Sequence, residues 1–172
     1  MKIFGITGWK NSGKTTLVVN IVSTLRARGY SVSTLKHAHH NFDIDKEGTD
    51  SFKHREAGAG EVLIVSNNRW ALMHELTGEN EPEMRDMLSK MSPVDIVIVE
   101  GFKQQDHPKL QVIRPDNNPD RLPESISNLV AIASDVDLTP GDYGCDGPLF
   151  NLNDVDAVVD FIVEHCQLPA RG

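Results

Sequence analysis

Residues 8–15 have the composition and spacing of a phosphate-binding loop. They read Gly-Trp-Lys-Asn-Ser-Gly-Lys-Thr and fit the Walker A pattern Gly-x4-Gly-Lys-[Ser/Thr]. The two glycines allow backbone N–H groups to approach and wrap a phosphate chain. Lys14 is expected to reach the terminal phosphates, and Thr15 carries a hydroxyl that can ligate Mg²⁺. The residues predicted to bind a nucleotide here are Gly8, Trp9, Lys10, Asn11, Ser12, Gly13, Lys14, Thr15 and Thr16.

The segments on either side of this loop predict the strand and the helix that it needs. Residues 2–7 are mostly apolar and predict a short buried strand. The segment that begins at Gly13 or Lys14 has apolar residues at helical spacing, and Gly29 lies just beyond its end. Such a helix would direct the positive end of its dipole at the phosphates. Residues 30–35 predict a second strand, which completes a strand-loop-helix-strand unit of about 30 residues.

Glu100 follows the most strongly apolar run of the chain, residues 94–99. Such a run is typical of a central strand covered on both faces. A Mg²⁺ ion at a phosphate loop keeps several waters, and a carboxylate at the end of a neighbouring strand can orient them. Glu100 is therefore the predicted acidic partner of the loop, and Lys14 and Glu100 are the two predicted catalytic residues. The alternative is a surface carboxylate after a strand.

The polar loop after the second strand carries further charged and imidazole side chains. Asp43 and Asp45 could reach the metal through water, so the predicted Mg²⁺ set is Thr15, Asp43, Asp45 and Glu100. The same carboxylates could equally be solvated surface groups. Lys36, His37, His39 and His40 precede them and could contact anions or gather a metal ion.

Asp135 is the candidate for recognition of the base. It follows a predicted strand at residues 129–133, where a carboxylate could accept the N1 and N2 hydrogens of guanine. No Asn-Lys-x-Asp guanine motif occurs in the chain. The alternative is an aspartate that caps a strand end, and the preference for guanine over adenine depends on this one residue.

The remaining segments predict an α/β fold of the P-loop NTPase type. Its mostly parallel sheet would be flanked by helices and would carry an added antiparallel β-hairpin, residues 62–65 and 70–73 around the turn at 66–69. The other elements expected are short helices over 49–57 and 82–90, a strand over 110–113 and a terminal helix over 154–165. At 172 residues and without an evident linker, residues 1–172 are expected to form a single nucleotide-binding domain.

Charge and composition limit the classes of partner. The net charge of −8 argues against a broad nucleic-acid surface, so no nucleic-acid partner is expected. Residues 1–40 nevertheless contain six Lys or Arg and no Asp or Glu, whereas residues 115–172 contain two basic and eleven acidic residues. The N-terminal segment is therefore where a small polyanion should bind, unless its charges are simply spread over a solvated surface.

The apolar segments are too short for a membrane span. The first, residues 3–6, is interrupted by Gly5 and is shorter than a secretory signal core, so a cytoplasmic location and no membrane partner are expected. Cys145 and Cys166 lack metal-binding spacing and should stay reduced there, although a disulfide in a dimer or a reactive thiol stays open.

Six short motifs follow one another in order along most of the chain. They are Gly-Trp-Lys-Asn-Ser-Gly-Lys-Thr-Thr, Leu-Lys-His-Ala-His-His, Asp-Lys-Glu-Gly-Thr-Asp-Ser, Arg-Trp-Ala-Leu-Met, Val-Glu-Gly-Phe-Lys and Ala-Ser-Asp-Val. In this combination the chain resembles the MobB family of molybdopterin-guanine dinucleotide biosynthesis adaptor proteins. Residues 115–127 and the last few residues contribute little to the resemblance.

The resemblance implies a GTP-binding adaptor with weak GTPase activity, and the cofactors expected are therefore GTP and the Mg²⁺ of the phosphate loop. It also implies a homodimer that assists molybdopterin guanylyltransferase, the enzyme that joins GMP to molybdopterin. Molybdopterin itself is a further candidate partner. Residues 8–16 would form the phosphate site, and Glu100 the acidic position. Residues 36–40 with 43–50 would form an adjoining mobile loop, and Lys103 matches the family pattern at a place that could face an anionic ligand or partner.

Fast hydrolysis is not expected. Efficient P-loop enzymes use an arginine finger or a water-positioning Gln, worth about 10³ to 10⁵ in rate. No residue of this sequence is evident in that role. Lys10 stands one position after the signature lysine of the P-loops that act across a dimer, so that function is not transferred to it.

Two other functions are compatible with the motifs. A small-molecule P-loop kinase would need a lid of converging arginines, and the candidates Arg55, Arg69, Arg85 and Arg114 are scattered. A metallochaperone GTPase of the nickel-insertion kind is suggested by His37, His39 and His40.

Overall fold

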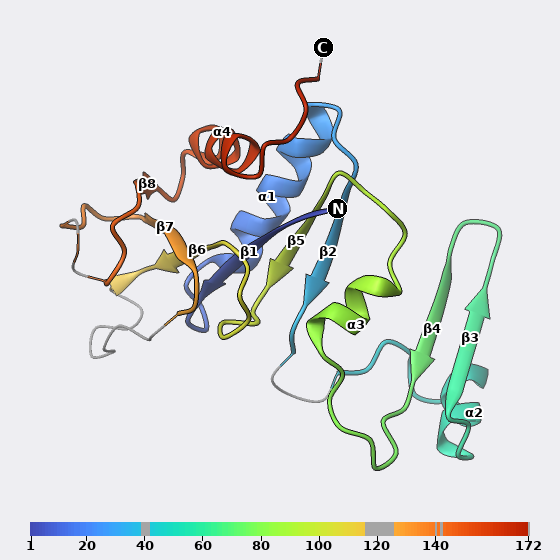
Figure 1. Ribbon diagram of the computed structural model, residues 1–172. Helices are drawn as coiled ribbons and strands as arrows, with labels where there is room; N and C mark the ends of the chain where they lie inside the picture. The colour runs from blue at the N-terminus through green and yellow to red at the C-terminus, as the bar shows by residue number, and fades with distance from the viewer. Residues whose placement is uncertain (39–41, 116–125, 140, 142, 172) are drawn as a thin grey trace. The chain divides into compact units, whose positions relative to one another are not determined.

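A computed structural model of the chain describes residues 1–38, 42–115, 126–139, 141 and 143–171. The chain forms two compact units, shown in Figure 1. The larger unit contains residues 1–37 and 88–172, and the smaller unit contains residues 38–87. The expectation of a single domain over residues 1–172 stays a prediction.

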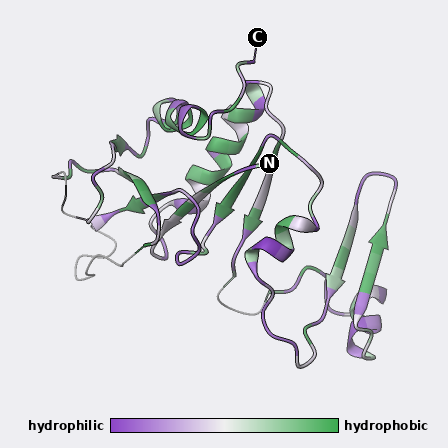
Figure 2. Ribbon diagram, in the orientation of Figure 1, coloured by the Kyte–Doolittle hydropathy of each residue, from purple (hydrophilic) through white to green (hydrophobic). Residues whose placement is uncertain are grey.

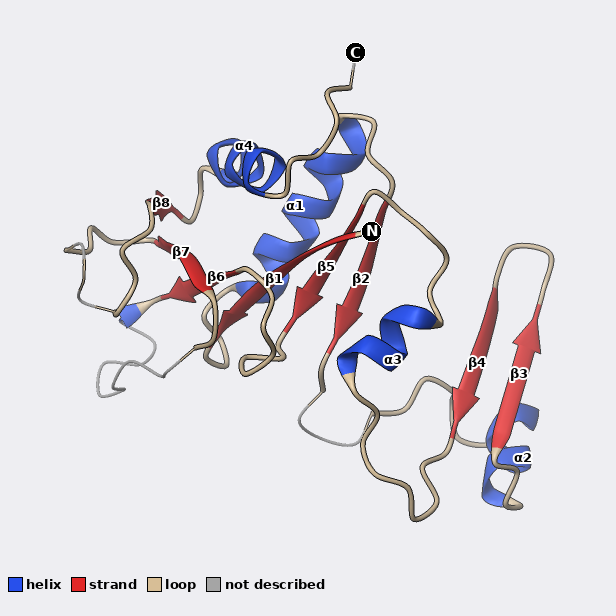
Figure 3. Ribbon diagram, in the orientation of Figure 1, coloured by secondary structure: helices blue, strands red, loops and turns tan. Residues whose placement is uncertain are grey.

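A six-stranded sheet forms the centre of the larger unit (Figure 3). Its strands are β1 (Lys2–Gly8), β2 (Val32–Lys36), β5 (Ile96–Glu100), β6 (Lys109–Ile113), β7 (Leu129–Ser134) and β8 (Leu149–Asn151). They lie in the order β2-β5-β1-β6-β7-β8, and the paired strands are parallel. The carboxyl ends of all six therefore meet at one edge of the sheet. In an open α/β sheet this edge is where ligands bind.

Two helices, α1 (Lys14–Ala27) and α4 (Val155–His165), pack against each other and on the sheet. Both contribute fully or almost fully buried apolar residues to one core with the central strands, among them Phe4, Ile6, Ile21 and Ile162. β5 and much of α1 and α4 accordingly appear green in Figure 2. The apolar residues predicted for α1 thus pack the helix that follows the phosphate loop against the sheet and α4.

The smaller unit contains α2 (Asp50–Glu56), β3 (Glu61–Val65) and β4 (Trp70–His74), and α3 (Met84–Ser89) begins at its end. β3 and β4 form the predicted antiparallel hairpin. Its turn is closed by Ser66, whose backbone N–H donates to the Arg69 carbonyl at 2.8 Å and whose hydroxyl accepts from the amides of Asn68 and Arg69. The mostly parallel sheet with an added hairpin confirms the predicted fold class.

Strand β8 is the one element of the sheet that the sequence analysis did not predict. Its three residues are too few to show a periodic pattern, and they directly follow Gly147-Pro148. Leu149 pairs with Ile132 of β7, which extends the sheet at this edge. Among the described residues, no helix is long and apolar enough to cross a membrane.

Candidate functional site

The loop between β1 and α1 adopts a conformation that depends on its glycines. Gly8 has a φ of 145°, and a Cβ atom there would lie 2.5 Å from the Val112 carbonyl oxygen and 2.9 Å from Ser12 Oγ. No side chain fits at that position. Gly13 has a left-handed φ of 93° and precedes α1 without a capping side chain. The helix N-terminus therefore offers its first N–H groups to a ligand, as the loop pattern predicts.

Two hydroxyl groups at this loop are buried without hydrogen-bond partners among the described residues. They belong to Thr7, which is fully buried, and to Ser12, which is 1% exposed. An unsatisfied buried hydroxyl costs about 1–3 kcal/mol. An oxyanion held in the loop would provide the acceptor that they lack.

Lys14 is surrounded by other charged side chains. Its ammonium donates a hydrogen bond to the Trp9 carbonyl, which folds the side chain back over the loop. Burial lowers the pKa of Lys14; nearby Glu100 counteracts this shift, whereas Lys103 and Lys36 add to it. Lys103 Nζ lies 4.4 Å from the centroid of the Trp9 ring, a cation–π contact. Three lysines thus gather near one glutamate, an excess of positive charge in a chain of net charge −8.

Glu100 lies beside the phosphate loop, at the carboxyl end of β5. Its Oε1 accepts a hydrogen bond from Thr15 Oγ1 at 3.3 Å and lies 3.2 Å from Lys36 Nζ. The Glu100 side chain is 13% exposed. The sheet register places Ile6 of β1 and Lys36 of β2 directly opposite Glu100. Glu100 and Thr15, both assigned to the predicted Mg²⁺ site, therefore lie together, and their role at a metal stays a prediction. Lys36 is a neighbour of Glu100 that the sequence analysis did not assign to it.

Arg114 links the predicted base-reading residue to the phosphate loop. Its Nε lies 3.0 Å from Asp135 Oδ2, and its Cζ lies 3.5 Å from the position of a Cβ on Gly13. The sequence analysis named Arg114 only as a scattered arginine. The signal that could have placed it is its position just after β6, the strand between β1 and β7.

A pocket of about 330 Å³ lies at the carboxyl ends of β7 and β8. Asp135 lines it together with Ser134, Asp137, Phe150 and Asn151. The pocket combines carboxylate and amide groups with an aromatic ring and aliphatic side chains. A planar heterocycle with polar edges would suit such a lining.

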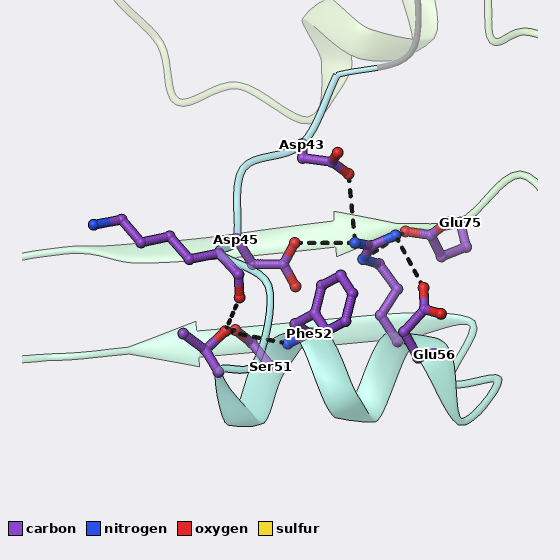
Figure 4. A network of polar contacts seen from close by, with 9 residues as sticks. Asp43, Asp45, Ser51, Phe52, Glu56 and Glu75 are labelled. Carbon is purple, nitrogen blue, oxygen red and sulfur yellow. Dashed lines mark hydrogen bonds and ion pairs between the residues drawn. The ribbon is translucent and has the colours of Figure 1, made fainter.

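Asp43 and Asp45 have a cationic partner within the smaller unit, as Figure 4 shows. Arg55 Nη2 lies 3.4 Å from Asp43 Oδ1 and 3.2 Å from Asp45 Oδ1, and Glu75 lies 3.7 Å from the same guanidinium. The hydrogen bond to Asp45 is the main cause of the raised pKa of Arg55. The proposed role of Asp43 and Asp45 as Mg²⁺ ligands stays a prediction.

The histidines of the segment after β2 are only partly described. His37 stacks on the Phe102 ring, with centroids 4.6 Å apart and planes inclined by 27°. His39 and His40 lie outside the described residues. Within the described part of the chain no three His, Cys, Asp or Glu side chains form a group that could hold a metal ion.

The fold and the loop together define the class of this protein. A parallel sheet whose first strand runs through Gly8–Thr15 into a helix, with an acid at the end of the adjacent strand, is a P-loop NTPase fold. Residues 3–135 match the family model described as "MobB: Molybdopterin guanine dinucleotide synthesis protein B". The chain belongs to the MobB family.

Relatives agree with this assignment, and a solved structure shares the fold. The chain is 36% identical to the molybdopterin-guanine dinucleotide biosynthesis adapter protein of Escherichia coli, over 96% of this chain and 93% of the relative. It is 37% identical to the adapter protein of the same name from Haemophilus influenzae, over 93% and 86%. The structure of Bacillus subtilis MobB superposes with a TM-score of 0.77 at 24% identity, covering 99% of this chain and 100% of that chain.

Proposed function

We propose that this protein is a GTP-binding adaptor with weak GTPase activity in molybdopterin-guanine dinucleotide biosynthesis. The observation that carries the nucleotide site is the phosphate loop with Lys14 folded over it and Glu100 hydrogen-bonded to Thr15. The adaptor role follows from the names of relatives that share 36–37% of their residues over most of the chain. Its partner would be the guanylyltransferase that joins GMP to molybdopterin, and molybdopterin itself is a further candidate ligand. The proposed location is the cytoplasm.

The residues at the loop fit a magnesium-bound triphosphate. Thr15 Oγ1 and Glu100 Oε1 lie 3.3 Å apart, so one Mg²⁺ with its waters could contact both oxygens. The unsatisfied hydroxyls of Thr7 and Ser12 and the excess of lysines suit the phosphates. Mg²⁺ would neutralise charge on the β- and γ-phosphates, while Glu100 would orient an attacking water. Slow hydrolysis is consistent with Arg114 being paired to Asp135.

Asp135 is proposed to select guanine. In the sheet order, β7 is two strands from β1. Asp135 lines the pocket at the end of β7 and pairs with Arg114, whose Cζ lies 3.5 Å from the position of a Cβ on Gly13 of the loop. A carboxylate there can accept hydrogen bonds from guanine N1 and N2, but adenine offers no such pair of donors. The aspartate would retain its contact with Arg114, which fixes the direction of its second oxygen.

Replacing Asp135 by asparagine should change the base preference from guanine to xanthine. The asparagine carbonyl can still accept from N1–H, but its NH₂ repels the 2-amino group of guanine and can donate to the oxygen at position 2 of xanthine. Hydrogen bonds to a charged group are worth about 1.5–3 kcal/mol, so GTP affinity should fall by about 10- to 100-fold. Fluorescence titration with GTP, ATP and XTP measures the change. Asp137→Asn, a neighbouring lining residue, is the matched comparison. GTP binding unchanged by Asp135→Asn would assign base recognition elsewhere.

The proposed homodimer would use an apolar face of the hairpin. Leu63 is paired with Leu72, and Val65 with Trp70, so the four side chains share one face. Their exposed fractions are 63%, 46%, 74% and 67% respectively. The opposite face contributes the buried residues Val62 and Met73. Four large apolar side chains on one side of a two-stranded sheet are typical of a surface that another protein covers.

The variant Trp70→Lys should therefore convert a dimer into a monomer. An ammonium at the centre of an apolar interface is costly because it loses its hydration. Size-exclusion chromatography with light scattering gives the mass directly. Asn67→Lys adds the same charge at the exposed turn and should leave the mass unchanged. A wild-type protein that is monomeric at all concentrations, or a Trp70→Lys protein that is still dimeric, contradicts the assignment of this face.

A further inference from the structure

Lys109 is a fully buried lysine in β6 whose ammonium is enclosed by backbone carbonyl groups. Nζ donates hydrogen bonds to the carbonyl oxygens of Gln105, His107 at 2.8 Å and Ser127 at 2.9 Å. An ammonium has three N–H donors, so this set of acceptors satisfies all of them. The three carbonyls belong to two segments, the loop after β5 and the turn before β7.

Among the described residues no carboxylate pairs with this ammonium, so its burial is costly. Desolvation lowers the pKa of Lys109 to about 8, and nearby Asp106 counteracts the shift. A buried aliphatic side chain of similar length would fill the same volume without this cost. The ammonium therefore has a use that packing alone does not explain, and its contacts show which segments depend on it.

The two segments that bind the Lys109 ammonium are also connected to the phosphate loop by contacts. The loop after β5 contains Lys103, and its backbone carbonyl accepts a hydrogen bond from the Ser127 amide at 3.3 Å. Ser127 is thus bonded to Lys103 through its N–H and to Lys109 through its C=O. The Lys103 side chain extends to the Trp9 ring. One continuous series of contacts therefore joins the buried ammonium to residue 9 of the phosphate loop.

We propose that Lys109 is a positioning residue: its ammonium fixes residues 103–107 against Ser127 and so holds the Lys103 cation over Trp9 at the phosphate loop. Lys103 then adds positive charge where Lys14 binds the terminal phosphates. The effect on nucleotide affinity rests on the proposed function, whereas the placement of Lys103 over Trp9 does not.

The test uses Trp9 as a reporter. The chain has two tryptophans, so Trp70→Phe leaves Trp9 as the only one. In this background, Lys103→Met removes the cation from the ring, Lys109→Met removes the buried ammonium, and Lys90→Met is an exposed control. The measurements are the quenching of Trp9 emission by acrylamide and the affinity for GTP, both on protein shown by circular dichroism to be folded. Lys109→Leu, which also lacks donors but is smaller, replaces Lys109→Met if that variant does not fold.

We expect Lys103→Met and Lys109→Met to expose Trp9 to the quencher to the same extent and to weaken GTP binding by about two- to fivefold, the value of one cation–π contact. The double variant should lose no more GTP affinity than Lys103→Met alone, because both changes remove the same contact. Folded Lys109 variants with wild-type quenching, or losses that add in the double variant, would overturn the proposal. If GTP binds to none of the proteins, the proposed function fails, and the quenching results still decide the role of Lys109.

Discussion

The Lys14→Ala variant is expected to bind GTP at least about 100-fold more weakly than the wild-type protein. The Lys14 ammonium should contact two phosphate oxygens, and hydrogen bonds to charged groups are worth about 1.5–3 kcal/mol each. The residue projects from the first turn of α1, and its ammonium donates a hydrogen bond to the Trp9 carbonyl within the same loop. Nucleotide binding should therefore depend on it far more than folding does.

The stability of Lys14→Ala separates a binding role from a structural one. Burial and two neighbouring lysines lower the pKa of Lys14, which means that the folded protein disfavours its charge. Removing the ammonium should leave the thermal unfolding midpoint unchanged or raise it. Calorimetric titration gives the affinity, and Lys90→Ala at an exposed position serves as the control. Wild-type affinity in Lys14→Ala would overturn the assignment of the loop as the phosphate site.

The Glu100→Gln variant should hydrolyse GTP about 10²- to 10³-fold more slowly, while its GTP affinity falls by less than about tenfold. Glutamine has the same shape and can still accept the Thr15 hydroxyl, but it cannot carry the negative charge that orients a metal-bound water. Binding depends mainly on the loop and on Lys14, so it should be less sensitive. The Lys36 ammonium, now 3.2 Å from Glu100 Oε1, would lose its counter-charge and become available to the phosphates.

Phosphate release under single-turnover conditions, with binding measured separately, tests this prediction. Glu164→Gln changes an exposed carboxylate at the end of α4 and should behave as the wild-type protein. Equal losses of GTP binding and GTP hydrolysis would indicate that Glu100 has a structural role. Hydrolysis at the wild-type rate would remove it from the proposed mechanism.

The elements around the phosphate loop could be predicted because local pattern and packing agree there. β1 is paired on both edges and α1 buries one face, so each shows the periodicity of its environment in the sequence. Glu100 could be placed near Thr15 by topology alone, since a parallel sheet brings the carboxyl ends of its strands to one edge. These predictions needed no knowledge of individual contacts.

The residues that the sequence analysis missed are those whose neighbours are set by strand order and register. Lys36 faces Glu100 because β2 pairs with β5 across 64 positions of chain, from Val32 to Ile96. Arg114 reaches Gly13 because β6 lies next to β1. Lysines are normally exposed, so the burial of Lys109 in β6 was not expected from its residue type. Its carbonyl acceptors come from irregular segments without a sequence signature. Asp43 and Asp45 meet Arg55 through a non-periodic loop in the same way.

The most direct test of the central claim is a calorimetric titration of the wild-type protein with GTP, and separately with ATP, in the presence of Mg²⁺. The loop from Gly8 to Thr15, with Glu100 at the metal and Asp135 at the base, predicts one GTP bound per chain, weaker binding when Mg²⁺ is removed, and weaker binding of ATP. The absence of saturable GTP binding, or tighter binding of ATP than of GTP, would contradict the account.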